Sequence, residues 1–417
     1  MVRLGIVGLG YVGLAIAREA TNVGLEVIGV DSRTDVVSQI NDGRAANGDY
    51  ADVDVSAILR ANFHASGSAA SLNGCDVIVV AVATPLDDKG VPDLSQVRSA
   101  AADVGAYLQQ GCLVVLESTT FPGTTDEVFA PALAEASGLE PGRDFHVAFS
   151  PERIDQGNAF YGLRNTPKVV GGLTEQCSLR AAQFYRLLCD RVVVARNCRN
   201  AEMSKLIENV YRNVNIALVN EIARAARNMG VDIWDAIECA ATKPFGFQPF
   251  YPGPGVGGHC IPSDPVYLAH RSRQVGHPLS LVELAIGINR SMPEYVGDRA
   301  AAVLAREAIP VSGARVLVAG VAYKRDSGDT TDTPAAGVVR CLRQMGSIVE
   351  FADPYVPSWS VDGINVDRIN DLEADIASFD LVVILQAHSR FEFDWLAVSS
   401  KILDATGTLN TEVVEKL

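Results

Sequence analysis

The sequence predicts an α/β protein in which two Rossmann-like, doubly wound domains are joined by a helical middle domain with a long central helix. Two stretches in which short apolar runs alternate with helix-like segments predict the outer domains, one starting near residue 2 and the other at Ala314. Apolar residues at helical spacing from Asn200 to Gly230 predict the long helix. The 417 residues suffice for two to three domains, and we predict domain ranges of 1–198, 199–298 and 299–417.

The first domain opens with a dinucleotide-binding fingerprint. A strand-like run over residues 2–7 leads into Gly-x-Gly-x-x-Gly, a helix-like stretch follows, and a second apolar run ends at Asp31. The glycines permit a tight turn, approach of a pyrophosphate to the backbone, and close packing of helix on strand. Asp31 would bind ribose hydroxyls and repel a 2′-phosphate, which favours NAD over NADP, although the neighbouring Arg33 weakens this choice. The predicted cofactor contacts are Gly8, Gly10, Tyr11, Val12, Gly13, Asp31, Arg33, Thr84 and Thr119.

Polar residues follow three further strand-like runs of the first domain. Thr84, Thr119 and Glu152 each come shortly after such a run ends. Open α/β sheets bind ligands at the carboxyl ends of their strands, so these side chains are candidates for a ligand site. Helix capping would explain either threonine equally well by itself. Because the pattern occurs in three loops, we favour the ligand site.

The loop over residues 251–264 presents a candidate nucleophile. Glycines at 253, 255, 257 and 258 remove side chains from the approach to Cys260, and Asp264 offers a carboxylate four residues further on. A thiol presented in this way, together with a nicotinamide cofactor, suggests oxidation through a thioester. The alternative is a small buried apolar cysteine. On the predicted long helix, Lys205 and Asn209 lie on one stripe, which is either functional or a solvated face.

Composition narrows the class of protein. A net charge of −15 argues against broad nucleic-acid binding, which needs a basic face. Eight cysteines without paired short spacings predict neither disulfides nor a metal site, and they fit a reducing cytoplasm. The apolar residues 4–17 resemble a signal peptide, but the glycine fingerprint explains them better. We therefore predict a cytoplasmic protein that binds neither nucleic acid nor membrane.

Beyond Ala314 a second βαβ pattern lacks the full glycine fingerprint. A strand-like run over residues 315–321 is followed by the loop 323–329, and further apolar runs lie at 347–352 and 380–385. This pattern suggests a second Rossmann-like domain that holds a different nucleotide. Lys324 and Arg325, at a strand end, would suit a phosphate group, although such a pair in a loop is more often solvated.

Taken together, these motifs resemble one family, the UDP-sugar 6-dehydrogenases, and within it the N-acetylhexosamine branch. The resemblance covers residue 1 to about residue 400 in consistent order. It implies oxidation of the 6-hydroxyl of a UDP-N-acetylhexosamine, UDP-N-acetylglucosamine first of all, to a carboxylate for polysaccharide precursor synthesis, with two NAD reduced. It also implies a homodimer or higher homo-oligomer formed through the long helix. The matching segments are 8–13, 83–86 with 92–95, 116–124, 150–155, 201–209, 242–247, the Cys260 loop, 288–294 and 320–326.

The resemblance also implies a role for each candidate residue. Cys260 attacks the enzyme-bound aldehyde, and Lys205 and Asn209 donate hydrogen bonds to the resulting oxyanion. Asp264 or Glu152 then activates the water that cleaves the thioester, while Thr119 holds that water or contacts the nicotinamide. Lys243 is a candidate donor from a neighbouring subunit, and Lys324 contacts the UDP part. The implied substrate contacts are Glu152, Arg153, Lys205, Asn209, Arg212, Lys243, Tyr251, Gly257 and Lys324.

Two departures from the family's pattern concern the nucleotide site. Where the family commonly reads Asp-Thr-Arg and Asp-Thr-Arg-Asn, this chain has Asp-Thr-Thr331 and Asp-Ala-Thr-Gly407, and we assign the missing arginines to Thr331 and Gly407. Each lost guanidinium weakens UDP binding by about 1.5–3 kcal/mol unless another basic residue replaces it. Candidate replacements are Arg325, Arg340 and Arg390.

Two further functions stay open at this point. One is a 6-dehydrogenase for UDP-glucose or another nucleotide sugar. The other is a regulatory protein that binds NAD without catalysis, against which the complete set of Cys260, Lys205, Asn209 and Asp264 argues.

Overall fold

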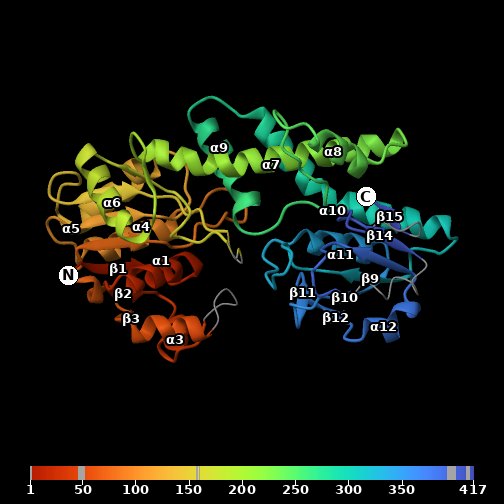
Figure 1. Cartoon of the computed structure of the whole chain (residues 1–417), viewed down its shortest axis with the longest axis horizontal. Coiled ribbons are helices and arrows are strands. Elements are labelled where there is room, and N and C mark those ends of the chain that lie inside the picture. Colours follow the sequence, from red (N-terminus) through yellow and green to blue (C-terminus); the bar gives the residue numbers. More distant parts are fainter. Residues whose placement is uncertain (1, 46–51, 156–157, 159, 392–400, 410–413) are drawn as a thin grey trace. The chain divides into compact units, whose positions relative to one another are not determined.

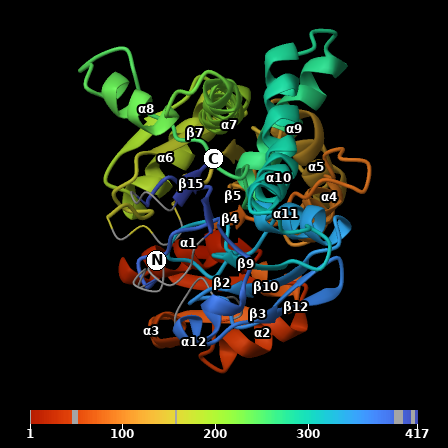
Figure 2. The same cartoon turned by 90° about the vertical axis from the view of Figure 1, so that its right-hand side faces the viewer.

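The computed structural model describes residues 2–45, 52–155, 158, 160–391, 401–409 and 414–417. These residues form an eight-stranded and a seven-stranded sheet, both predominantly parallel, together with a set of long helices (Figures 1 and 2). The chain divides into two compact units, Met1–Glu208 with Val266–His277, and Asn209–Pro265 with Pro278–Leu417. The fold class predicted from the sequence is confirmed.

The first unit is built on the eight-stranded sheet, whose order is β3-β2-β1-β4-β5-β6-β7-β8. Neighbouring strands run parallel except β6 and β7, which are antiparallel. The order reverses direction between β1 and β4, which is where open α/β sheets form their ligand-binding crevice. The strands are β1 (Arg3–Val7), β2 (Glu26–Val30), β3 (Phe63–Ser66), β4 (Val77–Val80), β5 (Leu113–Leu116), β6 (His146–Phe149), β7 (Lys168–Gly172) and β8 (Val192–Val194).

Helices cover both faces of this sheet, so its strands are apolar throughout. Val77 and Val79 of β4 join one buried cluster, and Ile78 and Val80 join another, because successive side chains of a strand point to opposite faces. The first cluster includes residues of α1 and α6, and the second includes residues of α4 and α5. The helices of this unit are α1 (Tyr11–Asn22), α2 (Thr34–Asn41), α3 (Asp52–Arg60), α4 (Ser95–Gly105), α5 (Ala130–Ser137) and α6 (Glu175–Leu188).

The second unit contains the seven-stranded sheet, in the order β11-β12-β10-β9-β13-β14-β15. β9 lies between β10 and β13, so the segments that leave these three parallel strands meet at one edge of the sheet. The elements are β9 (Arg315–Ala319), α11 (Pro334–Gln344), β10 (Ile348–Ala352), β11 (Trp359–Val361), β12 (Ile364–Arg368), α12 (Leu372–Asp375), β13 (Leu381–Ile384), β14 (Ile402–Asp404) and β15 (Val414–Lys416).

Four helices make up the middle of the chain: α7 (Cys198–Asn228), α8 (Ile233–Ala241), α9 (Cys260–Gln274) and α10 (Ser280–Arg306). The predicted long helix is α7, which Figure 1 shows as one continuous rod. α10 packs closely on α11, because a Cβ on Gly337 would lie 2.6 Å from Pro293 and one on Gly297 would lie 2.5 Å from the Cys341 sulfur.

The described residues contain neither a membrane-spanning helix nor a cluster of metal-binding side chains. No helix there has both the length and the apolar character to cross a bilayer. Nor do three or more His, Cys, Asp or Glu side chains in this part of the chain gather where they could bind a metal ion.

Candidate functional site

The three fingerprint glycines meet different surroundings. Gly8 has a φ of +95°, and a Cβ on it would lie 2.4 Å from the Ala81 carbonyl oxygen. A Cβ on Gly13 would lie 2.0 Å from the Gly8 carbonyl oxygen, so no side chain fits at either position. A Cβ on Gly10, the residue that caps α1, would meet nothing within 4 Å. The open space at Gly10 suits a pyrophosphate at the amino end of the helix.

Asp31 follows β2 and faces the same loop. Its carboxylate accepts hydrogen bonds from the backbone N–H groups of Leu9 and Arg33, each at 2.9 Å. The side chain is half-buried, whereas Arg33 is exposed at the start of α2. A carboxylate in this position suits the ribose of NAD and disfavours a 2′-phosphate. The chain's own groups therefore fit an NAD molecule.

The remaining predicted cofactor contacts lie around this loop and sheet edge. Tyr11 and Val12 form the first turn of α1. Thr84 is buried in the loop after β4, and its carbonyl oxygen accepts a hydrogen bond from the Tyr267 hydroxyl at 3.0 Å. Thr119 is half-buried in the loop after β5.

A buried carboxylate that the sequence reasoning missed holds this loop after β5. Glu202, one turn before Lys205 on α7, accepts from the Gly123 and Thr125 backbone N–H groups at 2.6 and 2.8 Å. The Thr125 hydroxyl donates to it at 2.7 Å. Burial raises the pKa of Glu202 to about 7, although these hydrogen bonds oppose the shift. Its only sequence signal is an acidic residue next to the apolar stripe of the helix.

Glu152 and Lys205 form a pair in the first unit. The Lys205 ammonium lies 3.7 Å from a Glu152 carboxylate oxygen, and the backbone N–H of Ile154 donates to the other oxygen. Both side chains are largely buried. Burial raises the pKa of Glu152, and the charge of Lys205 limits the rise. Glu152 is therefore a carboxyl group suited to taking up a proton.

A second buried pair fixes the two loops that carry Thr119 and Glu152. The Lys168 ammonium lies 2.6 Å from a Glu117 carboxylate oxygen and 3.2 Å from the Pro151 carbonyl oxygen. The Tyr185 hydroxyl donates to the same carboxylate, and burial raises the pKa of that tyrosine. Because Glu117 and Pro151 each stand within two residues of a predicted site residue, this network positions both loops. The sequence reasoning missed it.

The second unit brings together Cys260, Asn209 and Asp264. Cys260 is the half-buried first residue of α9, where the helix dipole favours negative charge. One turn later the buried Asp264 carboxylate accepts a hydrogen bond from the Asn209 amide. The Asn213 amide, one turn further along α7, donates to the Ile261 carbonyl oxygen at 3.3 Å. Asn209 lies one turn after Lys205. Helix α7 therefore carries one member of the Glu152–Lys205 pair and one member of the Asn209–Asp264 pair.

The glycines before Cys260 serve packing as well as access. A Cβ on Gly257 would lie 2.6 Å from the Cβ of Tyr323, and one on Gly258 would lie 2.7 Å from the Tyr323 ring. The Gly258 backbone N–H also donates to the Thr331 carbonyl oxygen at 2.9 Å. This part of the Cys260 loop therefore lies directly against the segment that follows β9. In contrast, a Cβ on Gly253 would meet nothing within 4 Å.

A cavity of about 230 Å³ lies between these two loops, within the second unit. The first turn of α11 forms part of its wall, so the amino end of an eleven-residue helix adjoins the cavity. The side chains that line it are uncharged, and Lys324 directly follows the lining residue Tyr323 in the sequence. The lining residues are Pro252, Gly253, Pro254, Gly255, Ala322, Tyr323, Thr333, Pro334, Ala335, Leu385, Gln386, Ala405 and Thr406.

The assignment of the second missing arginine to Gly407 is wrong. Gly407 has a φ of +66°, and a Cβ on it would lie 2.3 Å from the Trp234 ring, so no side chain fits there. Counted along the motif from Asp404, the arginine position is Thr406, which lines the cavity. Thr331 is exposed and has room for a longer side chain.

The candidate replacement arginines already have partners or lie in solvent. Arg340 forms two hydrogen bonds of 2.7 Å with Asp362, and Arg390 lies over the Tyr355 ring, 4.8 Å from its centroid. Arg325 is exposed.

The other implied substrate contacts are spread over both units. Arg153 binds Glu208 at 2.8 Å and donates to the Pro167 carbonyl oxygen at 2.6 Å. Arg212 is exposed on α7. The Lys243 ammonium lies 5.1 Å from the Phe245 ring centroid. The Tyr251 ring stacks on Trp234, and its hydroxyl donates to Glu238 at 2.7 Å.

Comparison with known proteins gives consistent matches along the chain. Residues 2–189, 199–291 and 317–412 match the NAD binding, central and UDP binding domains of the UDP-glucose/GDP-mannose dehydrogenase family. UDP-N-acetyl-D-mannosamine dehydrogenase from Pyrococcus horikoshii is 33% identical over 407 residues, which cover 96% of this chain and 93% of that protein. UDP-N-acetyl-D-glucosamine 6-dehydrogenase from Pseudomonas aeruginosa is 32% identical, with 94% and 92% covered.

Solved structures are similar over the same extent. The structure of the Pyrococcus horikoshii enzyme superimposes with a TM-score of 0.91 at 32% identity and covers 99% of this chain and 98% of that one. A UDP-glucose dehydrogenase from Pyrobaculum islandicum gives a TM-score of 0.89 at 26% identity, with 100% and 96% covered.

Proposed function

This chain belongs to the UDP-glucose/GDP-mannose dehydrogenase family and is an NAD-dependent nucleotide-sugar dehydrogenase, and on that premise we propose that it oxidises the 6-hydroxyl of a UDP-N-acetylhexosamine to a carboxylate. The observation that carries the proposal is Cys260 at the start of α9, one turn before an Asp264 carboxylate that is held by Asn209. A nucleophile, an amide and a carboxylate so arranged suit covalent oxidation of an aldehyde.

The chemistry is divided among the chain's own residues. Residues 8–13 and Asp31 would hold NAD, which would supply the hydride acceptor for each of the two oxidations. Between the two oxidations the Cys260 sulfur bonds to the aldehyde carbon and gives a thiohemiacetal. The second oxidation removes a hydride from this carbon and converts the thiohemiacetal to a thioester. Lys205 and Asn209, one turn apart on α7, are the donors that stabilise the oxyanions.

Hydrolysis of the thioester requires a base. Asp264 lies one turn after Cys260 in the sequence of α9, and Glu152 has a pKa raised by burial beside Lys205. Either carboxylate can take a proton from the attacking water, whose oxygen becomes part of the product carboxylate as the sulfur leaves. We assign this role to Glu152, because burial raises its pKa and so makes the carboxylate a stronger base. Thr119, in the neighbouring loop, orients the water or the nicotinamide.

The N-acetylated sugars are favoured by the relatives. The two proteins at 33% and 32% identity are named for UDP-N-acetyl-D-mannosamine and UDP-N-acetyl-D-glucosamine. UDP-N-acetylglucosamine, predicted from the sequence, is the first substrate to test, and its C2 epimer is the second. The product, a uronic acid sugar nucleotide, is a precursor for polysaccharide, and we place its synthesis in the cytoplasm.

A homodimer through α7 is part of the proposal. Ile207, Tyr211, Leu218 and Ile222 are 44–58% exposed and lie on one face of the helix. Exposed apolar stripes of this kind mark protein interfaces. In such a dimer Lys243 reaches the neighbouring subunit's site. Analytical ultracentrifugation of the wild type and Leu218→Glu tests this, and a monomeric wild type contradicts it.

The decisive experiment is turnover with a panel of nucleotide sugars. Purified protein and NAD are incubated with UDP-N-acetylglucosamine, UDP-N-acetylmannosamine, UDP-N-acetylgalactosamine and UDP-glucose, and NADH is measured against sugar consumed. We expect two NADH per N-acetylated sugar and no accumulation of free aldehyde. Preference for UDP-glucose would overturn the substrate, and NAD binding without any turnover would support the regulatory alternative.

A further inference from the structure

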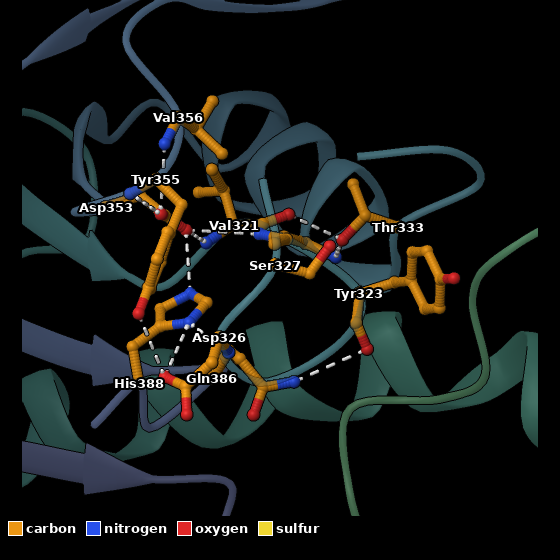
Figure 3. A network of polar contacts seen from close by, with 12 residues as sticks. Val321, Tyr323, Asp326, Ser327, Thr333, Asp353, Tyr355, Val356, Gln386 and His388 are labelled. Atoms are coloured by element: carbon orange, nitrogen blue, oxygen red, sulfur yellow. Dashed lines mark hydrogen bonds and ion pairs between the residues drawn. The ribbon is translucent and has the colours of Figure 1, made fainter. Parts of the chain in front are cut away.

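A buried histidine and aspartate occupy the carboxyl edge of the second unit's sheet. His388 follows β13 and is 1% exposed, and Asp353 follows β10 and is 3% exposed. These two strands flank β9, and both side chains contact the loop that leaves β9 (Figure 3).

Asp353 shapes the first part of that loop. One of its carboxylate oxygens accepts from the backbone N–H groups of Val321 at 2.8 Å and Ala322 at 3.2 Å. The same oxygen lies 3.0 Å from His388 Nε2. The other oxygen accepts from the backbone N–H groups of residues 355 and 356. Burial alone would raise the pKa of Asp353, but the hydrogen bonds from His388 and the backbone outweigh it and hold the pKa below its ordinary value.

His388 holds the far end of the same turn. The backbone N–H of Asp326 donates to His388 Nδ1 at 2.9 Å. An amide N–H can only donate, so Nδ1 is the unprotonated nitrogen, and the ring proton lies on Nε2, from which it is donated to Asp353. Asp326 has a φ of +57°, and its carboxylate accepts from the Ser389 backbone N–H and hydroxyl at 2.7 and 2.9 Å. Both ring nitrogens are therefore used to hold the loop.

Tyr323, Lys324 and Arg325 lie between these two anchors. The Gln386 amide, two residues before His388, adds a third contact by donating to the Tyr323 carbonyl oxygen at 3.3 Å. The Tyr323 side chain in turn lines the cavity and packs on the glycines before Cys260. The backbone on both sides of Lys324 is thus fixed by side chains that follow β10 and β13.

We propose that His388 is a positioning residue for the nucleotide sugar, because it holds the loop 321–326, and Lys324 with it, in the shape that binds the UDP part. This inference rests on the function proposed above. The matching carboxylate of the first unit, Asp31, also holds its loop but stays half-exposed, where it can reach a ribose. Asp353 is enclosed by His388, so its capacity for hydrogen bonds is used inside the protein and serves the shape of the loop.

Two substitutions separate the contacts of the ring. His388→Gln retains a donor that reaches towards Asp353 but loses the acceptor for the Asp326 N–H. His388→Asn retains an acceptor near the position of Nδ1 and loses the contact with Asp353. The matched control is Ser347→Ala, which removes one buried hydrogen bond, from the Ser347 hydroxyl to the Val311 carbonyl oxygen at 2.9 Å, at the opposite end of β10.

Calorimetry with UDP and NAD on the full-length variants provides the test. Loss of one buried hydrogen bond, worth about 1–1.4 kcal/mol, corresponds to a five- to tenfold change in affinity. We expect His388→Gln to weaken UDP binding by that factor, His388→Asn to weaken it less, and Ser347→Ala to leave it unchanged. NAD affinity and turnover at saturating sugar should stay at the wild-type level in all three.

Hydrogen exchange of the amides in residues 321–326 provides a second measurement that needs no ligand. Faster exchange confined to these residues in His388→Gln supports the positioning role. Unchanged UDP affinity in a folded His388→Gln variant, or an equal loss in Ser347→Ala, would overturn it. A wild-type protein that bound no UDP would instead overturn the proposed substrate, and it would also remove the loop's assignment to the nucleotide.

Discussion

Replacement of Lys168 by methionine should destabilise the first unit far more than the loss of an ordinary ion pair. The Lys168 and Glu117 side chains are 3% and 0% exposed, and the ammonium also holds the Pro151 carbonyl oxygen. Without the lysine, the Glu117 carboxylate stays buried with the Tyr185 hydroxyl as its remaining contact within the described network. Breaking a buried pair in this way costs about 3–5 kcal/mol, because an uncompensated charge is left in the interior.

Two further variants serve as references for the loss of stability expected in Lys168→Met. The double variant Lys168→Met/Glu117→Gln removes both charges, and we expect it to recover at least about 2 kcal/mol of the loss, since a neutral amide is cheaper to bury. Arg143→Met is the surface control: its partners are Glu140 and Asp144, and its side chain is 69% exposed. Exposed pairs contribute little to stability, so this variant should be close to the wild type.

The assay has to report on the first unit alone. Trp234 and Trp359, the tryptophans among the described residues, lie in the second unit, so their fluorescence serves as an internal reference that should not change. Hydrogen exchange of peptides covering 113–125 and 150–170 reports on the pair. A loss of 3–5 kcal/mol should speed exchange of the most protected amides more than a hundredfold, at tenfold per 1.4 kcal/mol. If Lys168→Met behaved like Arg143→Met, or the double variant were no better than the single one, the reasoning would be refuted.

Three other outcomes follow from the site. Cys260→Ser should lose turnover and keep NAD affinity, because a hydroxyl is a far weaker nucleophile; near-normal NADH production would end the thioester mechanism. Thr331→Arg should lower the Michaelis constant for the UDP-sugar without changing the ranking of sugars, since a guanidinium matches phosphate. Gly407→Arg should instead lower the thermal midpoint of unfolding, because the Trp234 ring occupies the space. Equal effects of the two substitutions would contradict this. Glu152 acts as a base only when it is ionised, and burial raises its pKa. The turnover rate should therefore rise with pH through a pKa above the ordinary carboxyl range. A turnover rate that rises through the ordinary carboxyl pKa would assign the base to another group.

Features that depend on neighbouring residues could be predicted from the sequence. The glycine fingerprint, the acidic end of β2 and the long helix α7 each follow from spacing within about thirty residues. The segment containing Cys260 was found for the same reason. The arrangement of α10 against α11 was not predicted, because the close approach at Gly297 and Gly337 depends on residues in another helix.

Networks between distant residues could not be predicted. Lys168 and Glu117 are 51 positions apart, and His388 and Asp353 are 35 apart. Each pair comes from two strands that have a third strand between them, and this order is a property of the folded sheet. Buried charged groups have no local signature, since a lysine or an aspartate at a strand end is usually solvated. Gly407 shows the same limit: a motif gives the count of residues from Asp404 but not the Trp234 ring that fills the space.

The three fingerprint glycines differ in what a mutation there would destroy. At Gly8 and Gly13 the obstacle to a side chain is the protein's own backbone, so a substitution there damages the folded domain whether or not NAD is present. At Gly10 the free protein offers no obstacle, and only a bound ligand would collide with an added methyl group. In a descendant of this chain that no longer needed its cofactor, substitutions at Gly10 would therefore be tolerated. Selection for folding would still preserve Gly8 and Gly13. Gly10→Ala is thus the natural route to a folded form of the protein that cannot bind the dinucleotide.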